Sequence, residues 1–161
     1  MKNRDLITLH NQLTTLEGTK FSVKFSYFVA KNKVMIKDEY GPLEEARRPD
    51  PKYTEYDSLR AKLAQELSDK DANGHPRIEN GNFVIVEKFT EFKEGLEKLK
   101  EEYAEAIKDQ EKKFKEFEAL LDEEVDYKGP KIDLKDIPEQ VEPSVLEILI
   151  VAGLIIDTDE Q

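Results

Sequence analysis

The sequence predicts a mainly α protein with a small β element, an α+β fold built as a helical hairpin around one long heptad-patterned helix, with a short β-hairpin at one end. Three observations predict this class. Apolar residues recur at helical spacing along much of the chain, the longest such pattern covers residues 87–124, and two Asn-Gly turn dipeptides separate it from the earlier helices. The length of 161 residues fits one domain. We expect a helical half (1–70), a β-hairpin (71–86), the long helix (87–124), and short strands with an apolar helix (125–161).

The first half of the chain is predicted to form three helices. Leu6, Leu9 and Leu13 recur on one helical face of the first. The second runs from Phe21 to about Tyr40, where Gly41-Pro42 interrupts or kinks it because proline has no N–H to donate and clashes with the preceding turn. The third covers residues 53–67. In the second helix the aromatic residues fall largely on one side and the lysines tend to the other. This pattern favours a core helix with a basic rim over the alternative, an RNA-stacking surface.

The middle of the chain combines a hairpin with the long helix. Residues 77–85 are expected to form two short strands that turn at Asn80-Gly81. In residues 87–124 the apolar residues follow alternating steps of three and four, and no proline occurs. A helix of that length needs another long helix against its stripe. We expect it to pack antiparallel on the helices of residues 20–40 and 53–67.

The last segment predicts short strands and a buried helix. Residues 125–134 hold two extended segments, which we expect to share one small sheet with the hairpin. Pro143 can start a final helix, since proline suits the first helical turn. The run from Val145 to Ile156 is apolar nearly all round and must be covered. We expect it to pack partly on the long helix and partly on another molecule.

Composition excludes several functions. The chain has 25 Lys+Arg against 36 Asp+Glu and a net charge of −11, which argues against direct nucleic-acid binding and against docking on anionic membranes. With no cysteine, disulfides and thiolate chemistry are excluded. We expect no signal peptide and no membrane span, because the densest apolar run is shorter than the about 20 residues that a spanning helix needs.

Catalytic patterns are missing from the sequence. His10 and His75 are the only histidines, and neither has metal-ligand spacing. No nucleophile elbow and no glycine-rich phosphate loop occur, and the paired carboxylates lie on an expected solvated helix face. We therefore expect a protein that is not an enzyme and has no cofactor.

One motif resembles half of an EF-hand calcium loop. Asp69, Asp71, Asn73 and Gly74 occupy its first positions. Pro76 stands at the eighth position, and the twelfth is asparagine where the loop needs a bidentate glutamate. We therefore expect no metal site but a helix end that leads into an Asx-type turn, with a weak calcium-binding module at 69–80 as an alternative.

The order of several segments resembles that of small uncharacterised proteins of tailed bacteriophages and prophages. The likeness rests on Lys31-Asn32-Lys33, on D-K-D-A-N-G-H-P at 69–76, on residues 120–125 and on P-S-V-L-E-I-L at 143–149. It covers most of the chain in general layout. It brings no catalytic residue and implies only a setting, which is the cytoplasm of an infected bacterium or a virion.

Two functional hypotheses follow. In the first, the protein uses a rigid acidic helical face to bind another protein that has a basic surface, such as a host or defence factor. In the second, it is a structural or assembly protein of a phage particle that forms homo-oligomers through the long helix and the C-terminal segment. The candidate interaction residues are Glu101, Glu105, Asp109, Leu146, Leu149 and Ile150.

Overall fold

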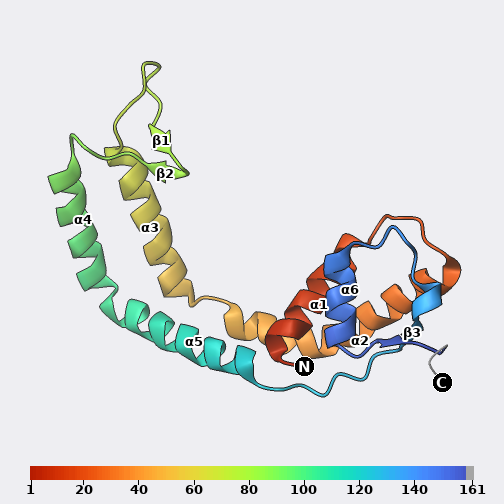
Figure 1. Ribbon diagram of the computed structural model, residues 1–161. Coiled ribbons are helices and arrows are strands. Elements are labelled where there is room, and N and C mark those ends of the chain that lie inside the picture. The colour runs from red at the N-terminus through yellow and green to blue at the C-terminus, as the bar shows by residue number, and fades with distance from the viewer. Residues whose placement is uncertain (159–161) are drawn as a thin grey trace. The chain divides into compact units, whose positions relative to one another are not determined.

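The protein is mainly helical, as predicted, in a computed structural model that describes residues 1–158 (Figure 1). The described residues form six α-helices, one short 3-10 helix and four strands of two residues each. The predicted single domain contains two compact units. Unit 1 combines Met1–Arg47 with the chain from Lys115 onward, and unit 2 is Arg48–Phe114. The boundary between Phe114 and Lys115 falls inside helix α5 (Ala104–Asp122), which therefore has residues in both units.

Unit 1 begins with two of the predicted helices. Helix α1 covers Asn3–Thr15 and α2 covers Val23–Arg47. The interruption that we considered at Gly41-Pro42 does not occur, because α2 continues through Pro42. A proline inside a helix loses one backbone hydrogen bond, and the helix nevertheless continues to Leu43, which is buried in the core.

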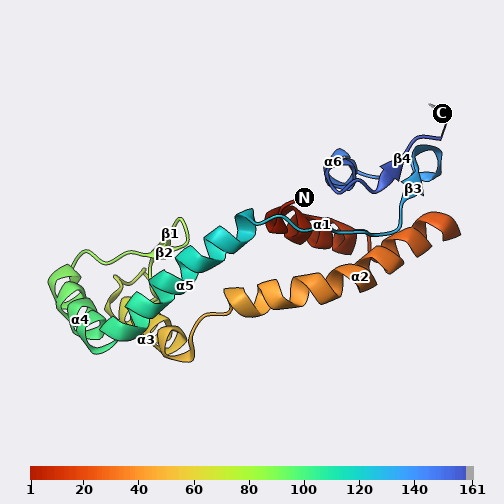
Figure 2. The same cartoon turned by 90° about the horizontal axis from the view of Figure 1, so that it is seen from below.

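Helix α1 is the centre of the unit 1 core, and it packs on both α2 and α6 (Pro143–Val151) (Figure 2). We expected the helix of residues 20–40 to pack on the long helix and the C-terminal apolar run to pack partly on it. Both have their main contacts with α1, and Leu120 of the predicted long helix packs against the same core. The three α1 leucines at spacings of three and four are fully buried and supply the apolar surface that both partners need. The largest fully buried residues of this core are Leu6, Leu9, Leu13, Phe25, Ile36, Leu149 and Leu154.

A small parallel sheet completes unit 1. Strand β3 (Ile132–Asp133) pairs with β4 (Ile155–Ile156), and a 3-10 helix, η1 (Leu134–Asp136), follows β3. Gly153 ends α6 with a φ of 65°, which directs the chain back towards β3. The single sheet that we expected to combine residues 125–134 with the hairpin is therefore wrong, since the described strands form two separate pairs.

The first residues of unit 1 are hydrogen bonded to the segment that ends α5 (Ala104–Asp122). The Asn3 backbone N–H donates to the Glu123 carbonyl over 3.0 Å, and the Asn3 side chain donates to the Leu120 carbonyl over 2.8 Å. Lys2 and Arg4 both form ion pairs with Asp122. The hydrogen bond from Lys2 and the charges of both cations hold the pKa of Asp122 below its usual value.

Unit 2 is a helical hairpin that carries a β-hairpin. Helix α3 (Pro51–Leu67) packs on α4 (Phe89–Glu102), which confirms the predicted contact of the 53–67 helix with this segment. Strands β1 (Ile78–Glu79) and β2 (Asn82–Phe83) pair antiparallel, as predicted. Asn80 and Gly81 between them have φ values of 50° and 78°, the conformation for which Asn-Gly is preferred in two-residue hairpin turns.

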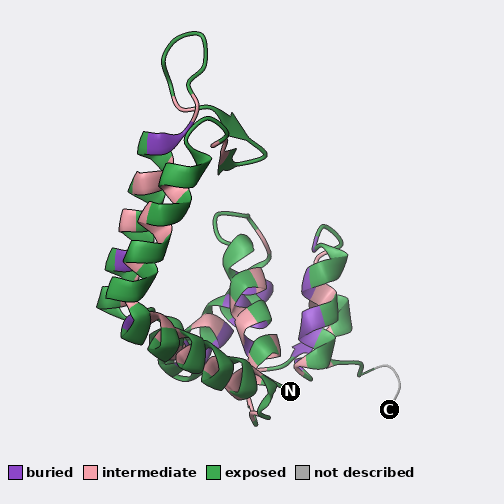
Figure 3. Ribbon diagram, turned by 90° about the vertical axis from the view of Figure 1, so that its left-hand side faces the viewer, coloured by how far each residue is buried: buried purple, intermediate pink, exposed green. Residues whose placement is uncertain are grey.

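The one long helix expected over residues 87–124 is two helices in the structure, α4 and α5, with Tyr103 between them. Its stripe is also less buried than expected. Helix α4 has no buried residue, and Ala106 is the only buried residue in α5. Figure 3 shows buried, intermediate and exposed residues along the ribbon. Gly95 marks the close approach of α4 to α3, because a β-carbon there would lie 3.0 Å from the Leu63 Cδ2.

Candidate functional site

Three of the predicted interaction residues lie beside the junction of α4 and α5. Glu101 is in the last turn of α4, and Glu105 and Asp109 are in α5, where their spacing of four residues puts them on one face. All three side chains are exposed, and among the described residues none of them forms an ion pair. Between positions 101 and 111 five acidic residues stand against one lysine. We call Glu101, Glu105 and Asp109 the junction carboxylates.

The junction itself is fixed by Tyr103. Its φ of −105° and ψ of 21° differ from helical values, although its N–H still donates to the Leu99 carbonyl over 3.0 Å. Its ring lies 6.0 Å from the ring of Tyr56 on α3. Partial burial raises the pKa of the Tyr103 hydroxyl, and the Glu55 carboxylate beside it raises the pKa further. The residue between α4 and α5 therefore lies against α3.

The C-terminal candidates divide between core and surface. Leu149 is fully buried in the unit 1 core, so its side chain has no surface to offer a partner. Leu146 is half-buried against the same core. Ile150 is 65% exposed and is therefore the one member of this group that a partner can reach over most of its side chain. The expectation that the apolar run would be covered nearly all round is not met within the described chain.

The calcium-like motif forms a turn. The Asp71 Oδ1 accepts hydrogen bonds from the backbone N–H groups of Asn73 and His75 over 2.8 and 2.9 Å. The Asp69 carboxylate accepts from the N–H groups of Val86 and Glu87, just before α4 begins. Both carboxylates thus have structural hydrogen bonds to the backbone. In the described part of the chain no three His, Asp or Glu side chains are grouped to hold a metal ion.

A groove on unit 2 lies between the helical hairpin and the β-hairpin. It has a volume of about 440 Å³ and is lined by Ala61 and Ala64 of α3, Phe83 of β2, and Phe92 and Leu96 of α4. Arg60 at its edge is engaged by Asp57 over 2.7 Å. The groove offers mainly apolar side chains and has no pair of groups suited to acid–base or nucleophilic chemistry.

Comparison of the chain with models of known protein families, with curated proteins and with solved structures finds no match. No described helix combines the length and the apolar character that crossing a membrane requires.

Helix α2 also has an exposed apolar face that was not predicted from the sequence. Phe25 and Phe28 face the core, as predicted, but Val23, Tyr27 and Val34 point outward with exposed fractions of 88%, 63% and 71%. The signal was present, because these three residues recur at spacings of four and seven. The lysines around them suggested only a polar rim.

Proposed function

We propose that the protein acts as a non-enzymatic binding protein, and that the junction carboxylates recognise a basic surface on another protein. The observation that carries the proposal is the exposure of Glu101, Glu105 and Asp109 without an ion-pair partner among the described residues. A carboxylate that is already free of cations need not give up an internal ion pair when it meets a partner's lysine or arginine. Complementary charge speeds the encounter and selects against acidic partners.

The position of the junction supports this role. Helices α4 and α5 meet at a residue held by Tyr56, so carboxylates from two helix segments are presented next to each other on a fixed part of unit 2. The helices bury few of their side chains fully, which leaves most of their surface available to a partner. The layout resemblance to phage proteins makes a bacterial host protein the first partner to seek.

Capture from a bacterial lysate tests the proposal. The full chain is immobilised and compared with a junction variant that carries Glu101→Lys, Glu105→Lys and Asp109→Lys. The control carries Glu66→Lys, Glu87→Lys and Glu118→Lys, three exposed sites with the same change in charge. We expect the parent and the control to capture the same basic protein, released by raised salt, and the junction variant to lose it. Equal capture by the junction variant would rule the proposal out.

A second candidate function, particle assembly, is favoured by one observation. Ile150 and Val151 at the end of α6 are 65% and 52% exposed. Adjacent exposed apolar residues of this kind mark association surfaces when they belong to a larger patch. In this role the C-terminal segment mediates contact between copies of the chain.

A further inference from the structure

We propose that the protein self-associates head to tail, with the outer face of α2 on one copy binding the outer face of α6 on a second copy. The proposal rests on the assembly role given above as the second candidate function and adds the surface that α6 meets. Both faces belong to unit 1, and each is exposed on a helix whose opposite side packs on α1. The α2 face comprises Val23, Tyr27 and Val34 with the neighbouring lysines, and the α6 face comprises Glu147, Ile150 and Val151.

The α2 face is apolar and basic. Its three apolar residues lie opposite the buried stripe that contains Phe25 and Ile36, so α2 is apolar on two sides. Residues 20–37 contain five lysines and no acidic residue. The Lys31 ammonium lies 5.7 Å from the centre of the Tyr27 ring, so one cation is held directly at the apolar stripe.

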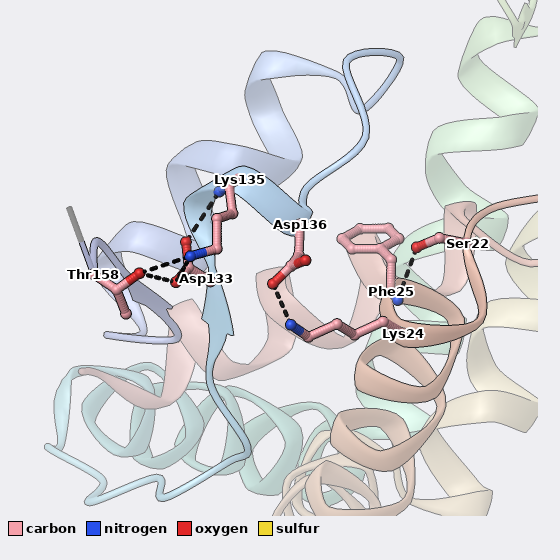
Figure 4. A network of polar contacts seen from close by, with 7 residues as sticks. All are labelled: Ser22, Lys24, Phe25, Asp133, Lys135, Asp136 and Thr158. Carbon is pink, nitrogen blue, oxygen red and sulfur yellow. Dashed lines mark hydrogen bonds and ion pairs between the residues drawn. The ribbon is translucent and has the colours of Figure 1, made fainter.

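Ion pairs inside unit 1 leave some of these lysines without a partner. Lys24 is paired with Asp136 of η1 (Figure 4), and Lys33 is paired with Glu17. For Lys20, Lys31 and Lys37 there is no ion pair among the described residues. Positive charge therefore remains available along the length of the α2 face.

The α6 face is apolar and acidic. Ile150 and Val151 follow Glu147 by three and four residues, which places all three on one side of α6, and all three are exposed. From residue 136 to residue 158 the chain contains no lysine or arginine but five acidic residues, at 136, 139, 142, 147 and 157, of which Asp136 is paired with Lys24. An apolar strip that carries the exposed Glu147 carboxylate is thus available to meet an apolar strip bordered by lysines.

Charge complementarity selects a second copy as the occupant. Two α2 faces would repel each other, and so would two α6 faces, because each pairing brings like charges together. The pairing of an α2 face with an α6 face removes both apolar strips from water and brings opposite charges together. Two different surfaces on one chain form a heterologous contact, which gives rings or open chains of copies rather than a symmetric dimer.

Light scattering of the full chain during size-exclusion chromatography tests the proposal. The α2 variant carries Lys31→Glu and Lys37→Glu, the α6 variant carries Glu147→Lys and Ile150→Lys, and a control carries Lys52→Glu and Lys62→Glu on α3. All of these side chains are exposed, and circular dichroism checks that each variant keeps the parent's helical content. We expect the parent and the control to exceed the monomer mass at low salt, and either face variant alone to weaken association at least tenfold.

The decisive sample is an equal mixture of the two face variants. Each variant keeps one intact face, so we expect the mixture to form a dimer and nothing larger. A parent that stays monomeric at low salt overturns both the proposal and the assembly role. If only the α6 variant loses association, or if the mixture stays monomeric, the assembly role through α6 stands and the α2 face is not its complement.

Discussion

The Tyr127 hydroxyl donates a hydrogen bond of 2.7 Å to the side-chain oxygen of Asn32, a fully buried residue in the middle of α2. The Asn32 amide donates in turn to the carbonyls of Phe28 and Pro130. The segment that follows α5 is thereby attached to α2 inside unit 1. Burial raises the pKa of Tyr127 to about 12, so the hydroxyl keeps its proton, and its ability to donate, throughout the neutral range.

Removal of this hydroxyl should destabilise unit 1. In Tyr127→Phe the Asn32 oxygen stays buried without a donor, which costs about 1–3 kcal/mol. Tyr27→Phe is the matched control, because the Tyr27 side chain is largely exposed, and we expect it to change stability by less than about 0.5 kcal/mol. Hydrogen exchange of the α1 and α2 amides measures the stability change in both variants. Equal protection in the two variants would show that the hydrogen bond contributes nothing.

Gly129 should be the least replaceable glycine of unit 1. A β-carbon at this position would lie 2.1 Å from the Asn32 Oδ1 and 2.6 Å from the Tyr127 ring, so Gly129→Ala must displace the hydrogen-bonded pair. We expect a loss of about 1–3 kcal/mol. Gly41→Ala, inside α2 with nothing beyond its own helical backbone and chain neighbours within 4 Å of the added carbon, should instead stabilise by about 0.5–1 kcal/mol. Thermal melts compare the two variants with the parent. A change of melting temperature in the same direction for both would contradict the difference in space around the two glycines.

Asp122 should make unit 1 sensitive to acid. Its folded pKa lies below the ordinary value of 3.8 because Lys2 donates a hydrogen bond to it and Arg4 lies beside it. The contribution of Asp122 to stability is therefore present above pH 3.8 and is lost as the pH falls through the folded pKa. We expect Asp122→Asn to be less stable than the parent at neutral pH and to lose less on acidification. Glu118→Gln, at an exposed site of the same helix, should follow the parent in melts across this pH range.

The contact between α3 and α4, which we call the α3–α4 seam, should be stabilised by side chains that are half-buried rather than fully buried. Leu99 on α4 is half-buried, so Leu99→Ala should cost about 1–2 kcal/mol, less than the loss typical of a fully buried leucine. Its neighbour Lys98 is exposed, and Lys98→Ala should stay within about 0.5 kcal/mol of the parent. Hydrogen exchange should rise in α3 and α4 of the first variant while α1 stays protected. Unchanged exchange in α3 would show that Leu99 does not belong to the seam.

Local signals in the sequence were sufficient for the elements with simple causes. The leucine spacing of α1, the Asn80-Gly81 turn and Pro143 at the start of α6 each predict the structure that forms. No glycine or proline marks the break at Tyr103 in the sequence, and in the structure Tyr103 contacts the ring of Tyr56 on another helix. Pattern analysis of one segment cannot detect such a cause.

Long-range packing also explains what was missed at the surfaces. Nothing near Asn32 in the sequence predicts its bond to Tyr127, 95 positions away. The burial of Leu149 and the exposure of Ile150 depend on which side of α6 meets α1, a choice that an almost uniformly apolar run does not encode. The junction carboxylates were predicted to be exposed because charged residues on a long helix face water in most arrangements, and the structure confirms that exposure.

The affinity of the captured basic protein for the full chain tests the central claim most directly. Calorimetric titration at low salt compares the parent, the junction variant and the Glu66/Glu87/Glu118 control. We predict that loss of Glu101, Glu105 and Asp109 weakens binding at least tenfold, about 1.4 kcal/mol, while the control stays within about twofold of the parent. Equal affinities of the junction variant and the control would contradict the claim that the junction carboxylates form the binding surface.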